Sequence, residues 1–192
     1  MEVRAAVADA CARLAGRLSD DALATVRGHL AAGERESAGS ALALGLARQG
    51  VGITGGERES LRPFLGDADL LDVPAVEEAP PVPYRFGPTA PADAVDPGRA
   101  DVLLLTNARY HGGLCLHRAW REPLEGARDT ATWVYLLRVV AGTDEVTACS
   151  GLASRLRTVL GEEHALEVVA EDRPLPPYQA AALDRAHLVW TA

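Results

Sequence analysis

The stretch TWVYLLRVVAGTDEVTACSGLASRLRTVLGEEHALEVVA, residues 132–170, decides the fold class of this chain. It begins with alternating apolar residues that predict a strand: Trp133, Tyr135, Leu137 and Val139. Asp144 then precedes apolar residues at helical spacing, and Gly161 stands where a helix-ending glycine belongs. A second apolar run, residues 166–170, follows a short loop. A strand, a helix of about 16 residues and a strand together predict a βαβ crossover with two parallel strands.

The neighbouring sequence extends this unit into a mixed sheet. Apolar runs predict strands over residues 102–106, 114–120 and 188–191, and residues 121–130 form a loop before the strand at Trp133. A short helix is expected over residues 178–186. Residues 100–192 therefore read as a mixed β-sheet with flanking helices.

Residues 1–65 have the periodicity of helices instead. Apolar residues recur every three or four positions through residues 3–18, and Ser19 followed by two aspartates predicts an N-cap for a second helix. A third helix is expected over residues 35–49. Thr54 with Glu57 is a capping box for a short fourth helix. The fold class is therefore α/β (or α+β), with an N-terminal helical subdomain before the sheet.

Residues 66–99 differ from both neighbours, because seven of the twelve prolines and many acidic residues lie there. A proline-rich backbone cannot donate a regular ladder of hydrogen bonds. This segment is predicted to be an acidic linker or an extended chain that wraps the surface.

The composition indicates the source more than the function. All 19 basic residues are arginine and isoleucine occurs once, at Ile53, which indicates GC-rich codons and a high-GC bacterium. Arginine occupies every position that lysine would otherwise share, so single arginines are weak evidence for phosphate chemistry. The three cysteines are scattered, unlike a disulfide framework, and are expected to be reduced in the cytoplasm.

The net charge of −8 lies entirely beyond residue 65, where 11 basic residues face 19 acidic ones. A nucleic-acid-binding protein would have the opposite sign, and no stretch is apolar enough to span a membrane. We therefore expect no nucleic acid and no membrane among its partners. The acidity favours another protein as the partner, for instance one with a basic surface.

Polar residues gather in one stretch, which supplies the candidate catalytic and metal-ligating residues: Asn107, His111, Cys115 and His117. Cys115 and His117 are two apart on a predicted strand and should face the same side. With Asp101 as a fourth ligand they would suit zinc, and a cysteine beside a histidine would suit a nucleophile. The competing interpretation is structural, since a cysteine in an apolar strand is usually a small core residue.

Other motifs carry little weight. Gly50, Gly52 and Gly55 match G-x-G-x-x-G, but a helix precedes them where a dinucleotide site requires a strand. The second and third helices could form a helix-turn-helix, although their charge is balanced. Nucleophile-elbow and phosphate-loop signatures are missing.

The leading hypothesis is a non-enzymatic interaction or regulatory module, for instance an accessory or immunity-type protein, with no cofactor. The alternative is a small enzyme with a Cys/His-based site around residues 107–117, and a transcriptional regulator is less favoured. Convergence of those side chains in a concave pocket would distinguish the first two. The oligomeric state is left open.

Overall fold

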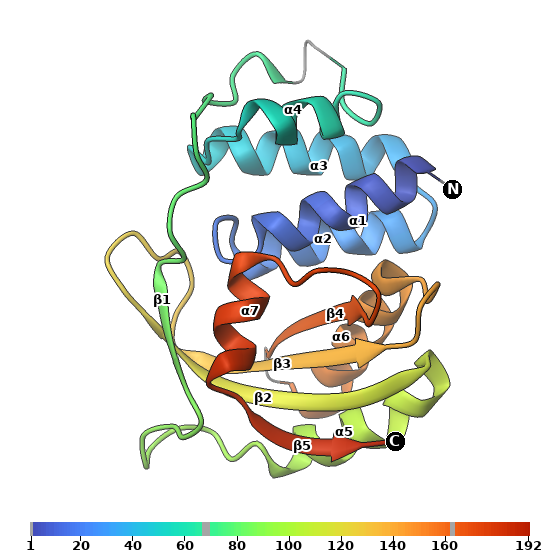
Figure 1. The fold of residues 1–192 in the computed structure, drawn as a ribbon, viewed down its shortest axis with the longest axis vertical. Coiled ribbons are helices and arrows are strands. Elements are labelled where there is room, and N and C mark those ends of the chain that lie inside the picture. Colours follow the sequence, from blue (N-terminus) through green and yellow to red (C-terminus); the bar gives the residue numbers. More distant parts are fainter. Residues whose placement is uncertain (1, 67–69, 162–163) are drawn as a thin grey trace.

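The computed structural model describes residues 2–66, 70–161 and 164–192. Within these residues the chain has an α/β fold with seven helices and a five-stranded mixed sheet. Four helices come first: α1 (Glu2–Leu14), α2 (Asp20–Ala31), α3 (Arg35–Arg48) and α4 (Gly55–Leu61). They form a layer above the sheet (Figure 1). The predicted order of a helical region followed by a mixed sheet is confirmed.

The sheet is built around one long strand, β2 (Gly113–Pro123), which pairs with three others. The strand order is β1 (Tyr84–Gly87), β2, β3 (Thr132–Val139) and β4 (Ala165–Ala170), and β5 (His187–Thr191) also pairs with β2. β2 is antiparallel to β1, β3 and β5. β3 and β4 are parallel and are connected by α6 (Glu145–Leu160), which confirms the βαβ unit.

One predicted strand is wrong. Residues 102–106 belong to helix α5 (Gly98–Ala108), which is followed by a 3₁₀ turn, η2 (Arg109–His111). Ala100, Leu104 and Ala108 lie four residues apart and are all buried, so the apolar run contributes one stripe of a helix. A short apolar run fits a buried helix as well as a strand, and here packing decides for the helix.

The local signals at helix ends are confirmed. The Ser19 hydroxyl accepts a hydrogen bond from the Ala22 amide, and Thr54 and Glu57 make both bonds of the capping box. Gly161 ends α6 with a φ of 68°. Of the G-x-G-x-x-G glycines, Gly50 and Gly52 lie in the turn between α3 and α4 and Gly55 begins α4, so a helix precedes them as predicted. The first helix ends at Leu14, before the predicted limit.

The proline-rich segment lies against the rest of the molecule over its described residues. β1 pairs with the far end of β2, and Tyr84 and Phe86 are buried among residues of the N-terminal helices. Val73 is buried in the same group. In Figure 1 this segment descends along one side from α4 to the bottom of the sheet.

The two faces of the sheet have separate apolar cores. On one face α7 (Pro177–Asp184) and the N-terminal helices pack against Ala119, Val134 and Ala165. On the other face α5 and α6 pack against residues that include Leu116 and Tyr135. Among the described helices none is long and apolar enough to cross a membrane.

Candidate functional site

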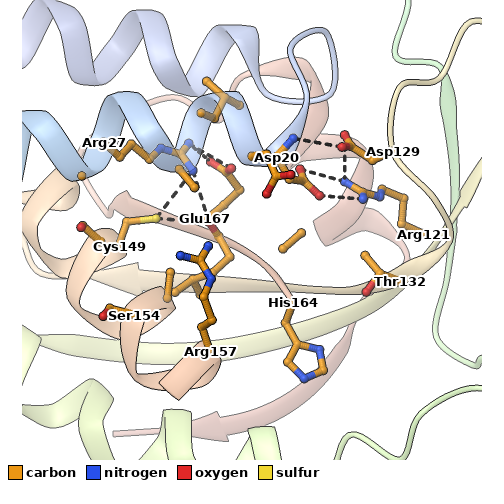
Figure 2. A pocket seen from close by; sticks show the side chains of 18 of the residues that line it. Asp20, Arg27, Arg121, Asp129, Thr132, Cys149, Ser154, Arg157, His164 and Glu167 are labelled. Atoms are coloured by element: carbon orange, nitrogen blue, oxygen red, sulfur yellow. Dashed lines mark hydrogen bonds and ion pairs between the residues drawn. The ribbon is translucent and has the colours of Figure 1, made fainter. Parts of the chain in front are cut away.

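A cavity of about 640 Å³ lies between α2, α6, the first residues of β3 and β4, and the loop that joins β2 to β3 (Figure 2). Its walls carry charged side chains and hydroxyls, and no Phe, Tyr or Trp lines it. Its size is that of a small-molecule site, but such sites are usually apolar. The polarity therefore favours a charged or strongly polar occupant.

One wall is built on the buried ion pair of Arg27 and Glu167. Nη2 of Arg27 donates to both carboxylate oxygens of Glu167, at 2.8 and 3.0 Å. Nη1 of Arg27 donates to the backbone oxygen of Leu166, 3.4 Å away. Nε2 of Gln179 gives Glu167 a further hydrogen bond at 2.9 Å. Because both charges are buried, this network fixes α2 and α7 to β4.

The second wall is built on Arg121, whose side chain is only 1% exposed. It forms a two-pronged pair with Asp20, at 2.7 and 3.1 Å, and also donates to the Tyr178 hydroxyl at 2.9 Å. Asp129 accepts hydrogen bonds from the Asp20 amide and the Tyr84 hydroxyl. Burial raises the pKa of Asp129, and the nearby Asp20 charge raises it further. Two carboxylates thus lie side by side around one buried guanidinium.

The α6 side of the cavity presents hydrogen-bond donors. Ser150, Ser154 and Arg157 line it from successive turns of α6, and His164 follows just before β4. Figure 2 shows Arg157 extending from α6 into the space below Arg27. Asp21 lines the opposite side from the first turn of α2 and is exposed. The α6 side therefore presents hydroxyls and a guanidinium, whereas the opposite side presents carboxylates together with the guanidiniums of Arg121 and Arg128.

The sequence-predicted residues do not line this cavity. Asn107 lies on α5, where its amide nitrogen donates to the Leu103 carbonyl and its oxygen accepts from Arg155 of α6. His111 lies in η2 with its ring beside Gly151 of α6. Both residues are on the side of the sheet that α5 and α6 cover.

Cys115 and His117 point to the other face, because the residue between them, Leu116, is buried against α5 and α6. Cys115 pairs with Arg138 across β2 and β3. Burial raises the pKa of Cys115, although Arg138 opposes this effect. Burial and Arg138 both lower the pKa of His117. The two side chains share a face as predicted, but the sheet separates them from Asn107 and His111.

The proposed fourth metal ligand, Asp101, is bonded to other side chains. It forms an ion pair with Arg118 and accepts a hydrogen bond from the Tyr135 hydroxyl at 2.9 Å. Within the described residues, no group of three or more His, Cys, Asp or Glu side chains could hold a metal ion. The geometry gives no support to a shared zinc site or to a Cys/His pair that acts together with Asn107.

The two edge strands of the sheet, β4 and β5, differ in whether their outward backbone groups are hydrogen-bonded. At the β4 edge Arg27 and Cys149 donate to the Leu166 carbonyl, and Glu145 accepts from the Ala170 amide. At the opposite edge β5 pairs with β2, and no strand in the described part of the chain pairs with its other side. The sequence of β5, HLVWT, has no Asp, Glu, Arg or Pro, and Leu188 is 48% exposed.

Sequence reasoning missed the cavity because its residues come from distant segments. Asp20 and Arg121 are 101 positions apart, and Arg27 and Glu167 are 140 apart. The one local signal was the pair of aspartates after Ser19, which was interpreted as helix capping alone. Searches against protein-family models, curated proteins and solved structures give no match for this chain.

Proposed function

We propose that the protein is a non-enzymatic protein-interaction module, an accessory or regulatory protein of the immunity type, in the cytoplasm of a high-GC bacterium. The observation that carries the proposal is the open, uncharged edge of β5 beside a sheet whose other edge is closed by side chains. Proteins usually protect such edges with charges, prolines or bulges because an open edge pairs with other chains. β5 has one bulge, between Leu188 and Trp190, but no charge and no proline, and such an edge suits the addition of a strand from a partner.

The geometry of β5 indicates which groups a partner would meet. The Ala192 amide donates to the Leu114 carbonyl of β2. Since backbone groups alternate in direction along a regular strand, the amide of Thr191, next to Ala192, faces away from β2. Because the bulge pairs Leu188 and Trp190 with the neighbouring β2 residues His117 and Leu116, their side chains stand on opposite faces and offer apolar contacts above and below the added strand.

The charge of the chain favours a basic partner. The net charge of −8 repels a second copy and attracts a positively charged protein from a distance. A five-residue edge also suits an extended segment better than a stable dimer, which usually requires at least about 1,200 Å² of buried surface. The partner is therefore a protein that presents an extended segment within a basic surface.

Site-specific photocrosslinking in the source organism tests this proposal. A photoreactive amino acid replaces Leu188 on the open edge, and in a control protein it replaces Ala32, which is exposed at the end of α2. We expect a discrete crosslinked protein from position 188 that mass spectrometry identifies, and none of that mass from position 32. Thr191→Pro should reduce the yield because it removes an outward amide.

Two results would contradict the proposal. The first is the same pattern of crosslinks from both positions, and the second is a discrete crosslink from position 188 that Thr191→Pro leaves unchanged. Thr191→Ala, which keeps the backbone amide, serves as the matched control for Thr191→Pro.

A further inference from the structure

The polar cavity between α2 and α6 is a second feature, independent of the β5 edge. From it we infer that the protein binds a neutral polyhydroxylated molecule, of the acyclic polyol class, in this cavity. The inference rests on the balance of charges in the walls, on donors and acceptors that occur together, and on a helix glycine that leaves part of the space open.

The charges that line the cavity are balanced. Among the lining side chains that the structure describes, four arginines accompany four acidic residues. Arg27 is paired with Glu167, and Arg121 is paired with Asp20, each through two N–O contacts (Figure 2). A charged ligand would lose its hydration without finding an opposite net charge in the walls. A neutral ligand does not incur this cost.

The α6 side offers hydroxyl groups. Ser150 and Ser154 lie about one turn apart on α6 and both line the cavity, and neither hydroxyl forms a hydrogen bond with a described residue. Opposite them, Asp21 in the first turn of α2 is exposed, and its carboxylate has no partner among those residues either. These three side chains are therefore available to a ligand.

Donors and acceptors occur together on the α2 side. The carboxylate of Asp20 is 37% exposed although it accepts from Arg121, so it keeps lone pairs for another donor. Arg128 lines the same side, where its Nε donates to the Arg17 carbonyl at 2.9 Å. The two terminal nitrogens of Arg128 have no partner in the described part of the chain. An ammonium group only donates and a carboxylate only accepts, whereas a hydroxyl does both. The mixture of groups therefore matches hydroxyls.

The walls favour an open-chain polyol over a cyclic sugar. No tryptophan, tyrosine or phenylalanine lines the cavity, so the apolar face of a sugar ring would find no aromatic ring to cover it. An acyclic polyol carries a hydroxyl on every carbon and has no such face. The volume of about 640 Å³ has room for such a chain.

A glycine in the middle of α2 keeps part of this space open. Gly28 lines the cavity, and a Cβ at this position would meet no atom of another segment within 4 Å. Its φ is not positive, so the backbone does not require glycine either. Glycine inside a helix is unfavourable compared with alanine. Since neither packing nor conformation demands it, the consequence of Gly28 is free volume in the cavity wall.

The experiment titrates the full chain with erythritol, xylitol and sorbitol in a calorimeter. We expect at least one of them to bind saturably with a one-to-one stoichiometry. Calorimetry is the readout because polyols also raise the Tm of proteins in general, by exclusion from their surface.

Ligand analogues test the chemistry of the site. The best polyol is compared with two derivatives that carry a carboxylate or an ammonium group in place of one terminal hydroxyl, and with the cyclic sugar glucose. We expect each of these to bind at least about tenfold more weakly than the neutral polyol.

Variants place the binding in the cavity. Gly28→Leu fills the open space and should weaken binding at least about tenfold. Gly56→Leu makes the same change on α4, outside the cavity and with no other segment within 4 Å of its Cβ, and should leave the Kd unchanged. Ser154→Ala removes one exposed hydroxyl and should weaken binding several-fold. It replaces Gly28→Leu if circular dichroism shows that this variant does not fold.

Three outcomes would overturn the inference. They are titrations in which no polyol saturates, a charged derivative or glucose that binds as tightly as the polyol, and cavity variants whose Kd equals that of Gly56→Leu. Because none of these measurements involves the β5 edge, a failure here leaves the crosslinking result unaffected.

Discussion

Arg27 of α2 and Glu167 of β4 form a two-pronged ion pair at the boundary between the helical layer and the sheet, with N–O distances of 2.8 and 3.0 Å. Their side chains are only 11% and 8% exposed. The same guanidinium also donates to the Leu166 carbonyl at the outer edge of β4. One side chain thus neutralises a buried carboxylate and satisfies an edge-strand carbonyl.

Arg27→Met should therefore destabilise the protein strongly. The variant leaves Glu167 buried without its cation, and the loss of one partner of a buried pair typically costs about 3–5 kcal/mol. Urea unfolding followed by circular dichroism measures the change. Adding Glu167→Gln to Arg27→Met should restore part of the loss because it removes the unpaired charge.

Arg13→Met provides the matched control. Its ion pair with Asp9 is mostly exposed, with side chains 51% and 32% accessible, so its loss should cost less than about 1 kcal/mol. If Arg27→Met is as mild as Arg13→Met, the buried pair does not hold α2 to the sheet.

The sequence predicted the fold where the signals were local. The alternation from Trp133 to Val139 and the glycine at position 161 mark elements whose period and ends are set by nearby residues. Residues 102–106 were misread because a run of five residues does not distinguish a period of two from one of 3.6. The decisive residues, Ala100 and Ala108, lie outside the run and are weakly hydrophobic.

The candidate site could not be predicted in the same way. Its charged pairs join α2 to β2 and β4 through contacts more than 100 residues apart, and no spacing rule links such positions. Because the chain has no lysine, arginine is also the basic residue at ordinary surface positions, so an arginine in the sequence does not indicate a functional position. The stretch Asn107 to His117 looked richer only because its polar residues are adjacent in sequence.

The three thiols should react slowly with iodoacetamide. Burial raises the pKa of Cys11 and Cys149 to about 11, and it also raises that of the half-buried Cys115. Since the thiolate is the reacting form, alkylation of the folded protein should stay slow below pH 8 and increase with pH. Mass spectrometry should find Cys115 modified first, as the most accessible of the three.

Cys115→Ala should cost about 1 kcal/mol, through a small loss of burial. Rapid alkylation of Cys115 near pH 6, or stoichiometric zinc by elemental analysis, would instead favour the enzyme alternative, with a site at Cys115 and His117 on their shared face of β2.

Acid should destabilise the protein partly through Glu57. Burial raises the pKa of Glu57, but hydrogen bonds from Arg17 and Thr54 outweigh it, so the pKa lies below its ordinary value of 4.5. A carboxylate whose pKa is lowered in the folded state stabilises the fold fully at pH values above its ordinary pKa. This contribution is lost as the pH falls through the lower, folded-state pKa. Glu57→Gln should lower stability at pH 7 and flatten its decline below pH 4.5.

Urea unfolding at a series of pH values measures this dependence. Glu59→Gln, on the same helix but exposed, should leave the pH profile unchanged. A Glu57→Gln profile parallel to that of the unmodified protein would show that the capping box does not supply the linkage.

Limited proteolysis should begin in the proline-rich segment. Glu77 and Glu78 are exposed and lie outside every helix and strand, whereas Tyr84 and Phe86 are held in the core. A glutamate-specific protease should therefore cut first after one of these two residues. The two fragments should elute together in gel filtration because the N-terminal helices pack on the sheet. An initial cut within α3, at Glu36, would contradict this assignment.

The association and dissociation rates of the partner at the β5 edge should respond differently to the charge of the protein and to the contacts on β5. The entire −8 charge lies beyond residue 65, and attraction between exposed charges is screened over about 8 Å at physiological salt. The association rate should therefore fall about tenfold or more as salt rises. The dissociation rate should change little, because the contacts on β5 are backbone groups and apolar side chains.

Thr191→Pro should instead accelerate dissociation and leave association nearly unchanged, since it removes a contact without altering the charge. Surface plasmon resonance with the crosslinked partner measures both rates, and salt-independent association would exclude electrostatic attraction of that partner.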